Sequence, residues 1–249
     1  MRRALNKIKP ASGFSHITHL LLRILLPILA YILVRTDFVG LAILLIFISK
    51  WRMFAVKPRY WLANLASSGV DLMVSVSLVL FMSNTSIQWW QLFWTALWIG
   101  WLLWLKPRSD PISVSAQAFI GQLLGISVLY LKFGDWPLAA LVFGTWGVAY
   151  LSARHFLTSF EEPRTALLSN VWAYFAASLA FILGHWMLFY GSVPQILVIL
   201  TTIGYGLAAF YYLDATDKLS VRLQRQLLGI MCVILVIVLV LSDWTGATV

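Results

Sequence analysis

The feature that most constrains this chain is a succession of long apolar runs separated by short polar segments. Transmembrane helices need about 17–25 mostly apolar residues, and nine runs come near that length: 17–34, 38–51, 61–82, 89–105, 112–131, 136–152, 165–190, 195–212 and 227–242. The second run is the shortest, and its alternative is a re-entrant segment. The connections leave no room for a soluble domain. The sequence therefore predicts one all-α transmembrane domain over residues 1–249.

Composition supports this prediction. The chain is 61% hydrophobic and 11% charged, whereas soluble domains are roughly 45–50% apolar and about 25% charged. Such a composition cannot cover a soluble surface, but a surface that faces lipid needs no polar cover. The lipid bilayer is thus the first expected partner. The formal charge of +9 does not predict nucleic-acid binding, because the basic residues occur in short clusters between apolar runs.

The lysines and arginines predict how the nine helices are oriented. With nine crossings the two termini lie on opposite sides, and the side richer in basic loops is cytoplasmic. Arg35 and Lys132 fall on one side. Fifteen basic residues fall on the other: Arg2, Arg3, Lys7, Lys9, Lys50, Arg52, Lys57, Arg59, Lys106, Arg108, Arg154, Arg164, Lys218, Arg222 and Arg225. We therefore expect a multi-pass protein of the cytoplasmic (inner) membrane, with its N-terminus cytoplasmic and its C-terminus outside.

A proline next to basic residues precedes four of the predicted helices. The segments are Lys9-Pro10, Lys57-Pro58-Arg59, Lys106-Pro107-Arg108 and Glu162-Pro163-Arg164, at intervals of 48, 49 and 56 residues. Proline suits the first turn of a helix because its missing N–H would be unpaired there. The pattern favours an internal repeat of four helical hairpins, followed by a ninth helix, as in transporters with parallel repeats.

An intramembrane carboxylate is the clearest candidate for function. Asn64, Ser68, Asp71 and Ser75 have helical spacing, which predicts one polar face with Asp71 about halfway along the third run. A carboxylate at that depth needs a partner, and Arg23 is the intramembrane cation that the sequence offers. Asp71 either lines a path for a proton, a cation or a cationic solute, or stabilises the fold.

Further polar and aromatic side chains extend this predicted core. Gln117 and Gln122 in the fifth run also need partners inside the protein. The fourth run carries a one-sided aromatic ladder, formed by Trp90, Trp94, Trp98 and Trp101. Such a ladder can pack against helices or lipid, and it can also bind a flat or isoprenoid-like ligand or stack on a cation.

Small residues recur along the seventh run, at alternating spacings of four and three. They are Ala166, Asn170, Ala173, Ala177, Ala180 and Gly184. Such a seam lets two helices approach closely, and Asn170 can bond across the contact. The neighbouring helix can belong to this chain or to another subunit, so a homo-oligomer or a membrane-protein partner is expected under the second interpretation.

One short motif suggests enzymatic chemistry. Asp214-Ala215-Thr216-Asp217 resembles the aspartate-rich motifs with which UbiA-type prenyltransferases hold magnesium and a pyrophosphate. That family has two such motifs, and the loop after the second run, KWRMFAVKPRYW, contains no carboxylate. There is also no P-loop, G-x-S-x-G or H-E-x-x-H motif. The sequence thus predicts no catalytic, cofactor-binding or metal-binding residues.

Three classes of function follow from these patterns. The leading one is a small transporter or channel-like protein with a polar core around Asp71. The alternative is a non-enzymatic membrane subunit or scaffold that packs through the seam at 166–184. The third is a lipid-modifying membrane enzyme that uses Asp214 and Asp217.

Overall fold

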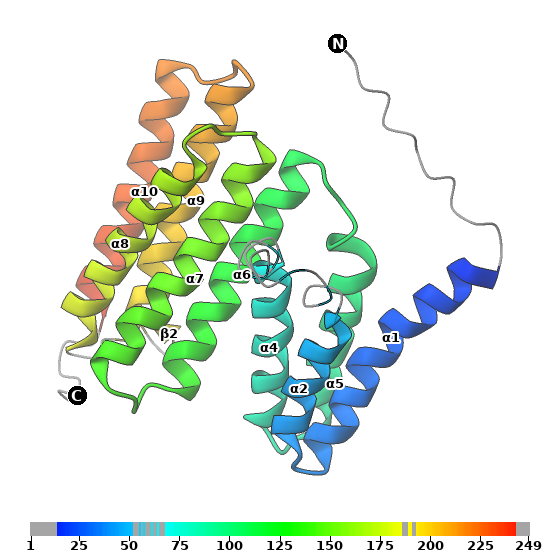
Figure 1. Ribbon diagram of the computed structural model, residues 1–249. Helices are drawn as coiled ribbons and strands as arrows, with labels where there is room; N and C mark the ends of the chain where they lie inside the picture. Colours follow the sequence, from blue (N-terminus) through cyan, green and yellow to red (C-terminus); the bar gives the residue numbers. More distant parts are fainter. Residues whose placement is uncertain are drawn as a thin grey trace.

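The computed structural model describes residues 14–51, 55, 57, 61, 64, 68–185, 189–190 and 193–242. Over this part of the chain it contains nine α-helices, and every predicted apolar run includes one of them (Figure 1). The helices are α1 (Phe14–Arg35), α2 (Val39–Ser49), α4 (Gly69–Ser83), α5 (Gln88–Gly100), α6 (Pro111–Lys132), α7 (Leu138–Ser159), α8 (Thr165–Gly184), α9 (Gln195–Ala215) and α10 (Val221–Leu241). Helix α5 continues into a π-helical turn, η3 (Trp101–Leu105). The predicted all-helical fold is confirmed.

Four of the described helices are long and apolar enough to cross a membrane. They are α6, α8, α9 and α10, while α2 and α4 are apolar but shorter. By length and composition these four candidate spans indicate a helical membrane protein. The other predicted crossings, the orientation and the compartment stay predictions.

Two of the predicted runs are interrupted. The run 61–82 was expected to form one helix, but α4 begins only at Gly69, and Ser68 lies in the turn before it. The run 165–190 was also expected to be helical throughout. Instead α8 ends at Gly184, and strands β1 (Phe189–Tyr190) and β2 (Val193–Pro194) pair antiparallel. At the end of the second of these runs, Gly184, Gly191 and Pro194 disfavour a continued helix even where the hydrophobicity continues.

Consecutive helices alternate in direction, so the connections fall at two ends of the bundle (Figure 1). We call one the basic end, where α2, η3, α7 and α9 end and α4, α6, α8 and α10 begin. The described lysines and arginines gather there, except Arg23 within α1 and Arg35 and Lys132 at the opposite end. The charge asymmetry found in the sequence is therefore an asymmetry of the fold.

The helices form two groups of four with the same order of neighbours. In the first group α1 contacts α2, α2 contacts α4, α4 contacts α5, and α5 contacts α1. In the second group α6, α7, α8 and α9 close a ring in the same order, and α10 packs on α9. Each group has its own apolar core, and α4 joins the groups through α6 and α7. A duplicated four-helix unit would produce this pattern, although the duplication itself stays a prediction.

The closest helix packing follows small residues, but their face differs from the predicted one. Ala173, Ala176 and Ala180 of α8 are fully buried, and α8 packs along α7. Ala166, by contrast, is exposed. Asn170 does not bond across the contact, because its side-chain amide donates to the Ala166 carbonyl oxygen of its own helix at 2.8 Å. The predicted face therefore differs from the buried face by one position at its centre, since Ala176 rather than Ala177 is fully buried.

Enlarging a fully buried alanine of α8 should destabilise the protein. We expect Ala176→Leu to lower the free energy of unfolding by about 1–3 kcal/mol, because a close-packed interface must shift to admit the larger side chain. Ala166→Leu on the same helix is the control, and it should stay within about 0.5 kcal/mol of the parent. Unfolding in mixed detergent micelles measures both. Equal effects of the two changes would contradict the observed packing face.

Candidate functional site

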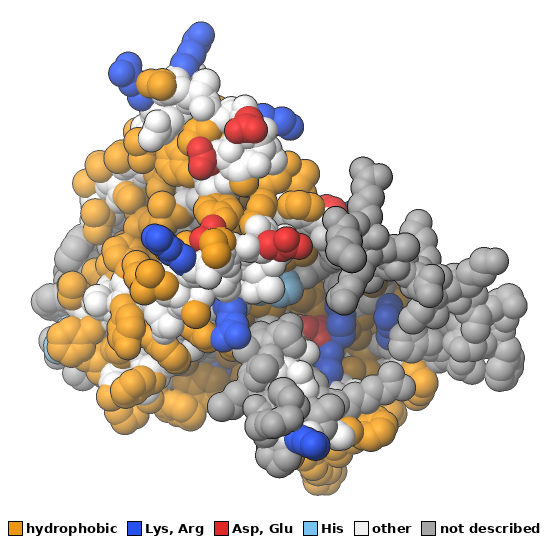
Figure 2. Space-filling view, turned by 45° about the horizontal axis from the view of Figure 1, so that its top comes forward, with side chains coloured by type: hydrophobic (Ala, Val, Ile, Leu, Met, Phe, Trp, Pro, Cys, Tyr) orange, Lys and Arg blue, Asp and Glu red, His pale blue; other side chains and the backbone are white. Residues whose placement is uncertain are grey.

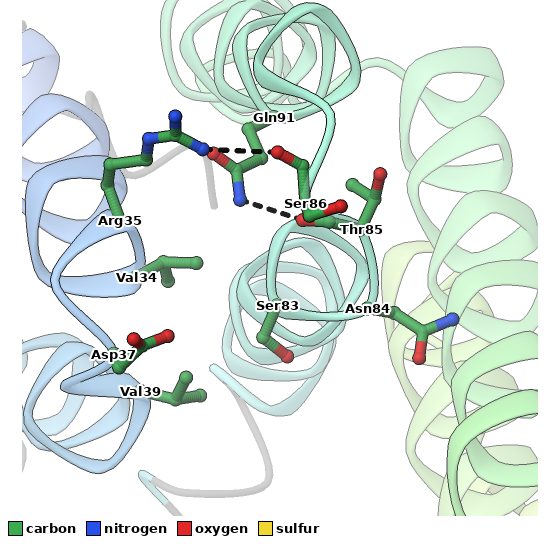
Figure 3. A pocket seen from close by; sticks show the side chains of 9 residues that line it. All are labelled: Val34, Arg35, Asp37, Val39, Ser83, Asn84, Thr85, Ser86 and Gln91. Atoms are coloured by element: carbon green, nitrogen blue, oxygen red, sulfur yellow. Dashed lines mark hydrogen bonds between the residues drawn. The ribbon is translucent and has the colours of Figure 1, made fainter.

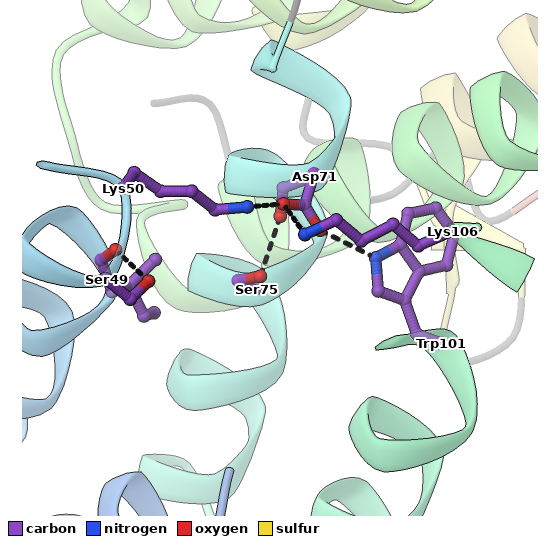
Figure 4. A network of polar contacts seen from close by, with 7 residues as sticks. Ser49, Lys50, Asp71, Ser75, Trp101 and Lys106 are labelled. Atoms are coloured by element: carbon purple, nitrogen blue, oxygen red, sulfur yellow. Dashed lines mark hydrogen bonds and ion pairs between the residues drawn. The ribbon is translucent and has the colours of Figure 1, made fainter. Parts of the chain in front are cut away.

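Asp71 is the centre of the polar contacts at the basic end (Figure 4). Lys50 and Lys106 both donate from their ammonium groups to its Oδ2 atom, Lys106 at 2.7 Å. Trp101 Nε1 donates to the other carboxylate oxygen at 3.0 Å. We call these four residues the Asp71 centre. Ser75 is buried beside it and donates to the Asp71 backbone oxygen at 2.7 Å, so the predicted Asp71–Ser75 proximity is confirmed.

The charged residues of the Asp71 centre come from three separate helix ends. Asp71 lies in the first turn of α4, where the helix dipole favours a negative charge. Lys50 is the residue that caps the end of α2, and Lys106 follows directly after η3. The centre therefore joins Asp71 to two residues that lie 21 and 35 positions away from it in the sequence.

The π-helical turn explains how Trp101 and Lys106 both reach Asp71. The Lys106 backbone N–H donates to the Trp101 carbonyl oxygen at 2.9 Å, which spans five residues. In an α-helix residues five apart point about 140° away from each other. An i→i+5 hydrogen bond instead widens the turn and brings them closer to one face. The π-helical turn thus directs an indole N–H and an ammonium group to one carboxylate.

Because α2 and α4 are short, the Asp71 centre is set back from the basic ends of the longer helices α6 and α7. Helix α4 has 15 residues and α2 has 11, so they extend ~22 Å and ~16 Å at 1.5 Å per residue. Helices α6 and α7 have 22 residues each, or ~33 Å, close to the ~30 Å of a bilayer core. In Figure 1, α6 and α7 continue beyond the basic ends of α2 and α4. Figure 2 shows basic, acidic and histidine side chains meeting in a recess on this face.

Both predictions about the surroundings of Asp71 need correction. Arg23 was the expected partner, but the ion pairs within the described residues join Asp71 to Lys50 and Lys106. Arg23 lies in α1 and is half-buried. Asp71 was expected halfway along a continuous helix, whereas it lies near the start of α4. Asn64 and Ser68 precede α4, and the Ser68 backbone N–H donates to the Asn64 carbonyl oxygen at 3.1 Å.

The two predicted glutamines have the internal partners that they require. Gln117 Nε2 donates to the carbonyl oxygens of Leu105 and Arg108 at 2.7 and 2.9 Å, and its Oε1 accepts from His155 Nε2 at 2.8 Å. It therefore fixes the turn that carries Lys106. Gln122 instead joins α6 to the second group: it donates to the Leu200 carbonyl oxygen at 3.2 Å and accepts from Trp172 Nε1 at 3.0 Å.

The buried face of α5 and η3 is a row of polar atoms rather than the predicted tryptophan ladder. Its members are Gln91, Thr95, Trp98 and Trp101, which are between 0% and 6% exposed, and we call them the polar row. Trp90 is 53% exposed. Trp94 is half-buried and stacks on Phe81 with ring centroids 4.8 Å apart. Half of the predicted ladder thus belongs to another face.

The polar row connects the Asp71 centre with the opposite end of the bundle. Trp101 belongs to both, and Gln91 lies ten residues earlier, ~15 Å along the helix. Thr95 donates to the Gln91 backbone oxygen at 2.8 Å. Trp98 Nε1 and Gln91 Oε1 are buried and have no hydrogen-bond partner among the described residues. Buried polar atoms are nearly always paired, so each of these two leaves a hydrogen bond unmade in this conformation.

The acidic residues at the basic end do not form a metal site in the described part of the chain. Asp214 and Asp217 are exposed beside the turn from α9 to α10, and no group of three or more metal-binding side chains was found among the described residues. Glu162 accepts from the Tyr211 hydroxyl at 2.5 Å. This hydrogen bond, with that from the Arg164 backbone N–H, lowers the pKa of the Glu162 carboxyl.

The fold and the site together define a helical membrane protein with a buried, lysine-rich polar centre. No protein-family model, curated protein or solved structure matches the chain. The function must therefore be inferred from the geometry of the site itself.

Removing the carboxylate of Asp71 should destabilise the fold more than removing either lysine. Asp71→Asn leaves two ammonium groups facing each other; breaking a fully buried pair in this way costs about 3–5 kcal/mol, and we expect somewhat less here because the three side chains are between 12% and 33% exposed. Lys50→Gln or Lys106→Gln leaves one ion pair intact, so we expect a smaller loss of about 1 kcal/mol. The free energy of unfolding measures all three, with the exposed Asp135→Asn as the control. If Asp71→Asn were as stable as Asp135→Asn, the centre would not support the fold.

Proposed function

We propose that the protein is a small multi-pass membrane transporter whose solute carries a compact anionic group. The observation that carries this proposal is the convergence of two ammonium groups and one indole N–H on a single carboxylate. Two positive charges against one negative charge leave the Asp71 centre with a net charge of +1. A partly buried charge without compensation is costly, so the centre attracts a second anion.

The geometry favours an anion over the proton or cation that the sequence suggested. A cationic solute would face Lys50 and Lys106, whose side chains are 17% and 33% exposed, before it reached Asp71, which is 12% exposed. An anion meets the lysines first. It then competes with Asp71 for the donors of Lys50, Lys106 and Trp101, which already point at one oxyanion.

The polar row supports a path away from the centre. Its four members offer hydrogen-bonding atoms along a buried helix face, and two of those atoms are unpaired among the described residues. In this structure the row is closed, because Val79, Met82 and Ala30 pack in the same core. Transport therefore requires α5 to separate from α4 and α1, which surround it.

The scaffold interpretation loses its main support. The fully buried members of the small-residue seam face α7 of the same chain. They are therefore not available to a second protein in this conformation.

Uptake into proteoliposomes tests the proposal. We expect the parent to take up at least one of three labelled probes, L-alanine, L-lactate and inorganic phosphate, faster than empty liposomes. Lys50→Gln and Lys106→Gln should each lower that uptake about tenfold, because each removes a charge-assisted donor. Lys218→Gln is the matched control, since Lys218 is exposed at the same end but outside the centre. Uptake that the two lysine changes leave intact would contradict the proposal.

A further inference from the structure

A second polar cavity lies at the opposite end of α2 and α4, between the α1–α2 turn and the α4–α5 turn (Figure 3). Its volume is about 330 Å³, near the lower limit of ordinary small-molecule sites, about 300–1,000 Å³. Charged and polar side chains line it, among them Arg35, Asp37, Ser83, Asn84, Thr85 and Gln91. We call this cavity the turn pocket. It is separate from the Asp71 centre but lies at the other end of the polar row.

The pocket carries one positive and one negative side chain that do not neutralise each other. Arg35 Nη1 donates to the Ser86 carbonyl oxygen at 3.1 Å, which leaves four of its five N–H donors. The described residues hold no ion pair of Arg35 with Asp37, and no hydrogen bond to the Asp37 carboxylate. Figure 3 shows both side chains on the α1–α2 side of the cavity.

The backbone holds Asp37 in an uncommon conformation. Its φ is 62°, in the left-handed region that aspartate and asparagine tolerate better than most residues. Its backbone N–H donates to the Val34 carbonyl oxygen at 3.1 Å. The carboxylate is therefore placed at the pocket by a fixed turn rather than by a contact of its own.

Gln91 lines the same pocket, and its side-chain amide is held in one orientation. The side chain is 4% exposed, and its Nε2 donates to the carbonyl oxygens of Thr85 and Met82 at 2.8 and 3.3 Å. Because both partners are acceptors, the amide nitrogen must face them and the orientation of the amide is determined. Gln91 Oε1 then has no partner among the described residues.

We infer that the turn pocket binds a small zwitterion that carries a carboxylate and a primary ammonium group, the chemistry of an α-amino acid. The Arg35 guanidinium binds the carboxylate with its remaining donors. The Asp37 carboxylate accepts from the ammonium N–H groups. An anion alone would meet the Asp37 carboxylate and a cation alone the Arg35 guanidinium, whereas a ligand with both charges matches both of these exposed side chains.

This site goes beyond the proposed transport function, because binding at the turn pocket does not require transport. The further claim that the bound zwitterion is also the transported solute, however, rests on the proposed function. The polar row then links two places that would each recognise the carboxylate of one solute, Arg35 at one end and the lysines at the other.

Binding to the full chain in phosphatidylglycerol nanodiscs tests the inference. The probe is labelled L-alanine, and propionate and ethylammonium serve as competitors that lack its ammonium or its carboxylate group. We expect L-alanine to bind and both competitors to bind at least about tenfold more weakly. Arg35→Gln and Asp37→Asn should each weaken L-alanine binding about tenfold or more. Asn is tolerated at φ 62°, so the second change preserves the turn.

Three controls separate the possible outcomes. Asp135→Asn, an exposed carboxylate in the turn between α6 and α7, should leave binding unchanged. Lys50→Gln should leave binding at the turn pocket unchanged while it lowers uptake. Adding phosphatidylethanolamine, whose headgroup has the same two charges, tests the source of the ligand: competition with L-alanine would support the site and assign a lipid headgroup to it.

Several results would overturn the inference. One is the absence of L-alanine binding above that of empty nanodiscs. A second is propionate binding that is as strong as L-alanine binding and is unchanged by Asp37→Asn. A third is ethylammonium binding that is as strong as L-alanine binding and is unchanged by Arg35→Gln. Binding that depends on Arg35 and Asp37 without any uptake would instead contradict the transport function and leave the site intact. Uptake that ignores both pocket variants, while these variants weaken binding, would contradict a role of the pocket in transport and leave the binding site intact.

Discussion

The need to neutralise charges away from water is the constraint on which the first four-helix group depends. Asp71 is held by Lys50, Lys106 and Trp101, and these residues come from the beginning or end of three different elements. Helix α2 buries Ala42 and Ile46 alone, which is too little to fix its own end, since helical stability comes mostly from tertiary packing. The carboxylate therefore determines where α2 ends and α4 begins relative to η3.

The two groups of helices differ in character although their neighbours are arranged alike. Of the four candidate spans, α6, α8 and α9 belong to the second group, and α10 packs on that group. The first group contains the shorter helices α2 and α4, the Asp71 centre, the polar row and the turn pocket. We interpret the second group as the part that holds the protein in the bilayer. The first is then the part with the groups to bind a solute.

The sequence predicted the helices well because hydrophobicity along the chain marks each apolar helix separately. It also predicted that Asp71 needs a partner, but it named Arg23. Lys50 and Lys106 were assigned to loops, because nothing in a linear pattern shows that α2 and α4 are shorter than α6 and α7 or that η3 is a π-helical turn. The same turn brings Trp101 and Lys106 onto one face. The predicted face of this helix assumed 3.6 residues per turn, so it could not show that alignment. The prediction also considered the large aromatic residues alone, and it therefore missed the polar atoms of Gln91 and Thr95.

The unpaired atoms of the polar row connect structure to function most directly. Leaving a buried donor or acceptor unsatisfied costs about 1–3 kcal/mol, and Trp98 Nε1 and Gln91 Oε1 are both in this condition among the described residues. Apolar side chains of similar size at these positions would carry no such cost. The closed conformation is therefore less stable than its packing alone would make it. A conformation in which α5 moves away from α4 and admits water or a polar solute would recover part of that free energy. The row thus favours the motion that would join the turn pocket to the Asp71 centre.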